Sequence, residues 1–250
     1  MTMSTHTAVA VLRSEWVKAR SVRAVHGSLT AVFAVTVAVS VLFSATIGQS
    51  EVDDLDGEPL FSAFYALNFG QIAAIAFGAT ALSSEFAGGA LRVSLSAVPR
   101  RGLFYASKMA VLGTAALIVG EAAGFVSFLL GQLFMGEFAI GLGDPGALRA
   151  VLGSGVYLAL MALFAAGLTA LLRSAVAVMS ILVPFILIVS FVVGDVSAGV
   201  ADFLPDRAGQ AILHETPTGS LGPWSGLAVT AAWTAAALLA GWWAIRTRDI

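Results

Sequence analysis

The chain has 250 residues, of which 58% are hydrophobic and only 11% charged, and its mean hydropathy is +0.92. A soluble domain carries about 25% charged residues, so this composition argues against a water-soluble globule, a disordered chain and a coiled coil. The absence of cysteine removes disulfides, thiolate metal sites and thiol nucleophiles. What remains is a membrane protein whose apolar residues are concentrated in spanning segments.

The first segment, residues 8–27, is basic and is expected to form a helix ahead of the first span. Four of its apolar residues recur at helical spacing, with polar residues opposite: Val9, Leu12, Trp16 and Ala19. This pattern indicates a helix that lies at the membrane surface, where long arginines can reach water. The alternative is an ordinary basic flank that only orients the first span.

Six apolar runs follow, each close to the roughly 20 residues that span the hydrocarbon of a bilayer. They are Ser28–Gly48, Leu60–Leu82, Lys108–Met135, Ala150–Leu172, Ser174–Gly194 and Trp224–Ile245. The runs are continuously apolar and do not alternate, which disfavours a β-barrel. Pro184 is expected to kink the fifth run. The sequence therefore predicts an all-α polytopic fold with six transmembrane helices, as a single transmembrane domain over residues 1–250.

The charges predict the orientation of these spans. With six crossings, both termini lie on one side, and that side holds eleven of the 13 basic residues. The other side holds only Arg149 and Arg207, together with an acidic run at residues 51–58. Cationic loops stay in the cytoplasm, so both termini are predicted to be cytoplasmic.

Two loops have a character of their own. The cytoplasmic loop, residues 83–107, has Leu91, Leu95 and Val98 at helical spacing. Pro99 ends that helix, and Arg100 and Arg101 follow at its C-terminal end, where positive charge suits the helix dipole. The outer loop, residues 195–223, is partly apolar and is predicted to be able to dip into the rim of the membrane.

Catalytic motifs are poor. No glycine-rich loop ending in lysine and serine or threonine is present, so the chain is expected to have no nucleotide site of its own and not to be an enzyme. The three histidines are far apart in sequence, and no metal site is expected. A G-x-G-x-x-G pattern begins at Gly141, but it lies in a short loop with Pro145 and is interpreted as a turn.

Glu121 is the ionisable residue placed deep inside a predicted span. A charged carboxylate there costs at least a few kcal/mol, so it is expected to face the interior of the bundle. Gly120 and Gly124 flank it and favour close helix approach. Its candidate partners are Asn68 and Gln71, three residues apart on the second span. Either the three form a polar patch on a transport path, or they form a buried structural hydrogen bond.

The cytoplasmic loop carries a resemblance to a known family. The residues that carry the resemblance are, in order, Glu85-Phe86, Gly89, Leu91-Arg92, Leu95, Pro99-Arg100-Arg101 and Lys108. Their pattern resembles that in membrane subunits of ABC transporters of the type-2 exporter family. The lead-in Glu15-Trp16, Lys18 and Arg20 is also similar to that family's N-terminal segment. The Ala87-Gly88 pair departs from the family's usual polar pair.

The resemblance implies a permease that pairs with a second permease subunit, identical or paralogous, and docks on two separate ABC ATPase subunits. ATP and Mg are then bound by the ATPase and not by this chain. The helix in residues 83–107 is the coupling helix. The residues implied in ATPase coupling are Glu85, Phe86, Gly89, Arg92, Leu95, Pro99, Arg100, Arg101 and Lys108. The resemblance further implies a bacterial cell membrane, contact with membrane lipids and no nucleic acid. The alternative for the loop charges is a solvated surface that only sets topology.

We therefore expect the permease subunit of an ATP-driven exporter. Two alternatives stay open: a membrane-embedded solute-binding component of an uptake system, and a small ion-coupled carrier that uses Glu121. An intramembrane enzyme is a third class, disfavoured because its catalytic residues are missing. The substrate is not specified by the sequence, because the lipid-facing and path-facing surfaces are both apolar.

Overall fold

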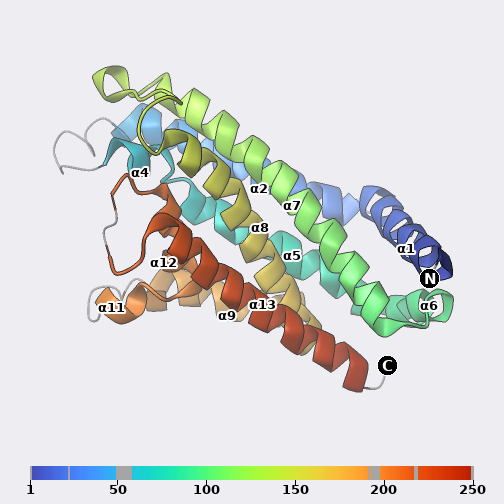
Figure 1. Ribbon diagram of the computed structural model, residues 1–250. Coiled ribbons are helices and arrows are strands. Elements are labelled where there is room, and N and C mark those ends of the chain that lie inside the picture. The colour runs from blue at the N-terminus through green and yellow to red at the C-terminus, as the bar shows by residue number, and fades with distance from the viewer. Residues whose placement is uncertain are drawn as a thin grey trace.

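The computed structural model describes residues 2–21, 23–48, 58–190, 192, 198–216 and 219–248, and over these residues it contains helices and no strands (Figure 1). Five helices are long and apolar enough to cross a membrane. They are α2 (Arg23–Phe43), α5 (Leu67–Phe86), α7 (Arg101–Gln132), α8 (Ala147–Leu172) and α13 (Pro223–Thr247). This agrees with the predicted all-α polytopic membrane fold.

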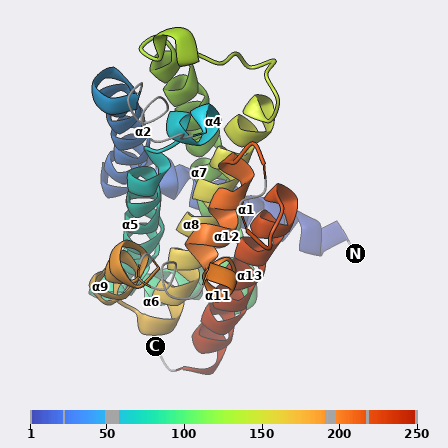
Figure 2. The same ribbon diagram turned by 90° about the vertical axis from the view of Figure 1, so that its left-hand side faces the viewer.

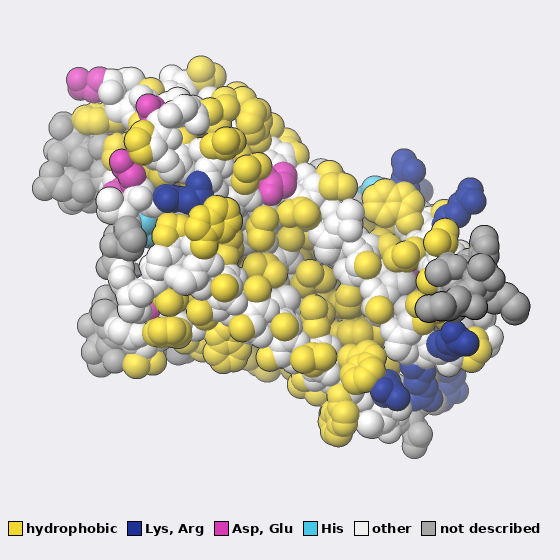
Figure 3. Space-filling view, in the orientation of Figure 1, with side chains coloured by type: hydrophobic (Ala, Val, Ile, Leu, Met, Phe, Trp, Pro, Cys, Tyr) yellow, Lys and Arg dark blue, Asp and Glu magenta, His cyan; other side chains and the backbone are white. Residues whose placement is uncertain are grey.

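The bundle has two chemically different ends. Both termini and the short helix α6 (Ala90–Ala97) lie at one end, here called the termini end. Helices α4 (Pro59–Ala63) and α12 (Pro205–Gln210) lie at the other, here called the far end (Figure 1). On the face seen in Figure 3, lysines and arginines gather mainly at the termini end and acidic side chains toward the far end, with an apolar band between them. Of the acidic run at residues 51–58, residues 51–57 lie outside the described residues.

Helix α8 forms the centre of the bundle and packs against α5, α7 and α13, which Figure 2 shows around it. The α7–α8 contact depends on the predicted glycine pair. A Cβ at Gly120 would lie 3.1 Å from the Gly155 carbonyl oxygen, and one at Gly124 would overlap Ser154 Oγ. Because only glycine leaves room for this approach, the prediction that Gly120 and Gly124 favour close helix packing is confirmed.

The fifth predicted span consists of α9 (Ala175–Pro184) and a π-helix, η4 (Phe185–Val189). It begins near the termini end, where the Arg173 guanidinium lies 6.0 Å from the Phe86 ring. It reaches the far end, where Ser190 hydrogen-bonds Asp206 of α12. The α-to-π change occurs at Pro184, which has no N–H to donate. Residues 191 and 193–197 of this run lie outside the described residues, and the apolar helix, Ala175–Ile188, is shorter than the other five.

The predicted N-terminal helix over residues 8–27 falls within helix α1, from Thr2 to Ser21, and the first residues of α2, which begins at Arg23; residue 22 lies outside the described residues. A π-helix, η1 (Ser44–Gly48), follows α2. α1 packs on α7 through a face that buries Val11 and Glu15. Within the predicted apolar stripe, Val9 and Leu12 are exposed, so that part of it faces away from the bundle.

The second span and the cytoplasmic loop are also rearranged relative to the prediction. The run Leu60–Leu82 divides into α4 and α5, with a turn at residues 64–66. The loop 83–107 is mostly helical, with a 3-10 turn, η2 (Ala87–Gly89), then α6, and only residues 98–100 without helix before α7 begins. Gly88 and Gly89 have φ of +59° and +78°, a left-handed backbone that glycine adopts without steric cost and that turns the chain from α5 into α6.

The outer loop folds back onto the far half of the bundle. Its helices are α11 (Ala198–Ala201), α12 and η5 (Ala211–Leu213), and residues 193–197 and 217–218 lie outside the described residues. Ile212 and Leu213 are buried, and Thr230 of α13 donates a hydrogen bond to the Pro205 carbonyl at 2.8 Å. A further 3-10 turn, η3 (Gly136–Phe138), precedes α8, and the glycine pattern from Gly141 lies in a turn, as predicted.

Candidate functional site

Four charged side chains from three helices meet at the termini end and are here called the charge cluster: Glu15, Lys18, Glu85 and Lys108. Lys108 Nζ lies 2.5 Å from Glu85 Oε1 and 3.1 Å from Glu15 Oε2. Lys18 Nζ lies 3.1 Å from Glu15 Oε1 and 3.6 Å from Glu85 Oε1. The charges therefore alternate, with each lysine between the same two carboxylates.

Three of these four charged side chains are buried, which makes their pairing important for stability. Glu15, Glu85 and Lys108 are only 3%, 6% and 7% exposed, and Lys18 covers them from the solvent side. A buried charge is expensive unless it is paired and hydrogen-bonded. Glu15 Oε2 has an ion-pair contact with Lys108 but no hydrogen bond. Each charge of the cluster therefore has an opposite charge beside it, but this one oxygen lacks a well-directed donor.

Ser94 links the charge cluster to α6. Lys18 Nζ donates to Ser94 Oγ at 2.9 Å, and Ser94 Oγ donates to Glu85 Oε2 at 3.2 Å. Ser94 was not predicted from the sequence. Its position three residues after the buried Leu91 places it on the inner face of α6, which was the available signal. The short helix is thus held against α1, α5 and α7 together.

The structure divides the predicted coupling residues into internal and exposed ones. Glu85 and Lys108 are internal, and Leu95 and Phe86 are half-buried. Glu85 pairs with Lys108 and Lys18, because the start of α7 and the end of α5 lie side by side. Gly89, in the left-handed region, precedes the first residue of α6.

The exposed predicted residues lie on the outer face of α6 and just after it: Arg92, Pro99 and Arg100. Val93, which was not predicted from the sequence, is 72% exposed on this same face. Val93 therefore gives α6 an apolar contact point that the described part of the chain leaves largely uncovered.

Arg101 has a different role from the predicted one. It was placed at the C-terminal end of the loop helix, but it is the first residue of α7. Its Nη1 donates to the Ile245 and Arg248 carbonyl oxygens, both at 3.1 Å. Carbonyls at a helix C-terminus lack intrahelical donors and carry partial negative charge. Arg101 therefore stabilises the end of α13. On α1, the Arg20 guanidinium lies 6.0 Å from the Trp16 ring.

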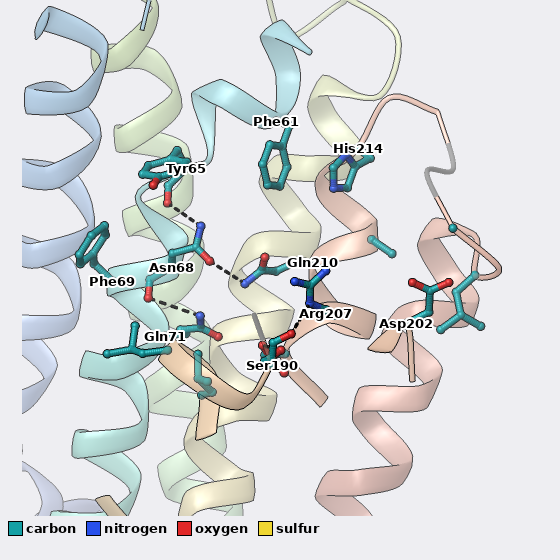
Figure 4. Close-up of a pocket in the computed structure, with 16 residues that line it drawn as sticks. Phe61, Tyr65, Asn68, Phe69, Gln71, Ser190, Asp202, Arg207, Gln210 and His214 are labelled. Atoms are coloured by element: carbon teal, nitrogen blue, oxygen red, sulfur yellow. Dashed lines mark hydrogen bonds between the residues drawn. The ribbon is translucent and has the colours of Figure 1, made fainter. Parts of the chain in front are cut away.

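A second group of polar side chains, here called the polar network, lies toward the far end (Figure 4). Gln71 Nε2 donates to the Asn68 carbonyl at 3.3 Å, and Gln210 Nε2 donates to Asn68 Oδ1 at 3.0 Å. Tyr157 of α8 donates its hydroxyl proton to Gln71 Oε1. The expected proximity of Asn68 and Gln71 is therefore observed, while their partners Tyr157 and Gln210 were not anticipated.

Glu121 does not join the polar network. Its side chain packs against Gly155 of α8, where an added Cβ would overlap the Glu121 carboxyl. Asn68 and Gln71 instead hydrogen-bond one another, and they hydrogen-bond Gln210 of α12 and Tyr157 of α8. Their hydrogen bonds are therefore made without a carboxylate. The predicted cluster of these three residues is wrong in this respect.

Comparison with protein-family models, with curated proteins and with solved structures finds no match to this chain. Among the described residues, no group of three His, Asp or Glu side chains is placed to hold a metal ion. Over its described residues the chain is thus an all-helical protein with five helices long and apolar enough to cross a membrane, and its short helix α6 is tied through the charge cluster to α1, α5 and α7.

Proposed function

We propose that this chain is the membrane-spanning permease subunit of an ATP-binding cassette exporter of a bacterial plasma membrane. In this proposal α9 and η4 form a sixth crossing, and both termini and α6 face the cytoplasm. The resemblance of the loop and lead-in sequences supports it, as does the concentration of basic side chains at the termini end.

The observation that carries the proposal is the charge cluster. Its four residues all belong to the two sequence segments that resemble the exporter family, and they meet although they are far apart in the chain. A pattern that only set topology would leave these charges solvated. Buried, mutually paired charges instead fix the relative positions of α1, α5, α6 and α7.

This arrangement suits a helix that is pushed by a partner. ATP, with Mg, closes the partner ATPase subunits, and α6 rests on one of them through its exposed face, with Val93 and Arg92. Motion of α6 passes to α1 through the Lys18–Ser94 hydrogen bond, and to α5 and α7 through Glu85. Glu85 and Lys108 are then positioning residues, and the docking contacts come from the outer face of α6.

Two further parts complete the proposal. Helix α1 lies along the cytoplasmic membrane surface, with exposed Val9 and Leu12 toward lipid and Arg20 beside Trp16. A second permease subunit completes the translocation path.

Co-purification from native membranes tests the proposal. The tagged full chain, extracted in mild detergent, is expected to retain a stoichiometric ATPase, and Val93→Glu is expected to release it. Val17→Glu is the matched control, since Val17 is 59% exposed on α1 at the same end. Loss of the ATPase in both variants, or in neither, contradicts docking on α6.

The same preparation distinguishes the carrier alternative. Transport in vesicles that persists without any ATPase, responds to a pH gradient and disappears in Glu121→Gln would establish an ion-coupled carrier. The exporter proposal predicts no transport without the ATPase. If Glu121 lines the translocation path, Glu121→Gln alters the substrate preference without loss of assembly; unchanged transport of every tested substrate leaves Glu121 a structural role.

A further inference from the structure

A cavity of about 560 Å³ opens at the far end, on the opposite side of the bundle from the charge cluster. It lies between the α4–α5 segment, η4 and α12, so three separate parts of the chain build it (Figure 4). Its volume is within the range of small-molecule sites, roughly 300–1,000 Å³. The polar network forms part of its wall through Asn68, Gln71 and Gln210, whose mutual hydrogen bonds fix their positions.

Asp206 supplies a buried carboxylate to this cavity. It is 4% exposed, and its Oδ2 accepts a hydrogen bond from Ser190 Oγ at 2.6 Å. Its Oδ1 is buried and has no hydrogen-bond partner. An acceptor left in this state costs the free energy of its lost hydration, so a donor that reached it from the cavity would bind favourably.

The charges around the cavity favour a cation. Asp202 and Asp206 contribute two carboxylates, against one guanidinium from Arg207. The Arg207 Nε is engaged with the Ser190 carbonyl at 3.0 Å, and His214 is turned to Glu58, with Nδ1 3.1 Å from Oε2. The described charged groups that line the cavity therefore leave an excess of one negative charge.

Three aromatic side chains also line the cavity: Phe61 of α4, Tyr65 of the turn at residues 64–66 and Phe69 of α5. Figure 4 shows Phe61 beside His214, and Phe69 on the side of α5 away from Gln210. Phe61 stacks on His214 and Tyr65 stacks on Phe43, so one face of each of these rings is covered within the chain. Phe69 is 44% and Tyr65 37% exposed, so the rest of the aromatic surface comes mainly from these two side chains. Aromatic faces attract organic cations and bury apolar groups.

We propose that this cavity binds an organic ammonium compound, with its protonated amine at Asp206 and its apolar body against Phe61, Tyr65 and Phe69. A primary or secondary amine fits better than a quaternary one, because the unpartnered Oδ1 requires an N–H donor. The inference does not depend on coupling to an ATPase, because it concerns only the far end of this subunit.

The test uses the full chain in phosphatidylcholine nanodiscs and the fluorescent amine dansylcadaverine, with empty nanodiscs as background. Its N-acetyl derivative has the same apolar body without the charge, and dansyl-aminohexanoic acid carries a negative charge instead. The amine is expected to bind saturably, and the acetylated and acidic probes at least tenfold more weakly, as the loss of a charge-assisted hydrogen bond implies.

Variants place the binding in the cavity. Asp206→Asn is expected to weaken the amine at least tenfold, while Glu137→Gln, an exposed acidic site in η3, leaves it unchanged. Phe69→Ala is a second test of the site if Asp206→Asn does not assemble. It is expected to lower the affinity for the amine and for the acetylated probe alike, because both share the apolar body. Equal binding of the charged and acetylated probes by the wild-type chain, preference for the acidic probe, or full binding in Phe69→Ala overturns the proposal.

Discussion

Replacing Lys108 by alanine is predicted to be far more damaging than replacing Lys18, although both lysines contact the same two carboxylates. Lys108 is 7% exposed and makes the 2.5 Å contact with Glu85. Its loss leaves Glu15 and Glu85 buried with one remaining cation, and removing one partner of a buried pair costs about 3–5 kcal/mol. The side chain of Lys18 is 41% exposed, and exposed ion pairs contribute about 0–1 kcal/mol.

Thermal unfolding in nanodiscs measures the difference. For a chain of this size, 1 kcal/mol shifts the midpoint by about 2–4 °C. Lys108→Ala is therefore expected to lower the midpoint by about 6–20 °C, and Lys18→Ala by at most about 4 °C. The double variant Lys108→Met/Glu85→Gln should recover part of the loss, because it removes both charges of the Lys108–Glu85 pair and leaves Glu15 with Lys18. Equal effects of the two lysine variants would refute the burial argument.

Three further predictions concern packing, the turn and pH. Gly78→Ala should destabilise by about 1–3 kcal/mol or more, because its Cβ would overlap the Ala162 backbone; Gly27→Ala, with open space around it, should leave the unfolding midpoint unchanged or raise it. Gly89→Ala should cost about 1–2 kcal/mol in the same assay because φ is +78°, and an unaltered midpoint would count against the turn. Burial raises the pKa of Asp206 above its ordinary value, so the folded chain binds the proton more tightly than the unfolded chain, and stability should fall as pH rises from the ordinary aspartate pKa through the raised one. Asp206→Asn should remove that slope, and a slope identical in both proteins would contradict it.

The sequence predicted the charge pattern well and its geometry poorly. Glu85 and Lys108 stood out because they belong to a spaced motif, and Glu15 and Lys18 because they belong to another. That these two segments meet depends on α1 packing against α7, a tertiary contact that local spacing does not encode. The apolar stripe of α1 was predicted from the spacing of its apolar residues. The buried face of α1 was not predicted, because it follows the ion pairs of Glu15 and not that spacing.

The far end was predicted less completely. Asn68 and Gln71 were selected because amides three residues apart share a helix face. Tyr157 and Gln210 completed their hydrogen bonds, and Glu121 did not, because the α7–α8 packing holds it against Gly155. Asp206 was overlooked because an aspartate in a loop is ordinary, and only the fold of the outer loop buries it.

The most direct test of the central claim uses the absence of cysteine in this chain. Ser96→Cys places a single thiol on the exposed face of α6, and Glu137→Cys places one at the far end. In intact cells, a membrane-impermeant maleimide is expected to label Glu137→Cys and to leave Ser96→Cys unlabelled until the membrane is opened. Labelling of Ser96→Cys from outside intact cells would contradict a cytoplasmic α6, and with it the proposed docking of an ATPase.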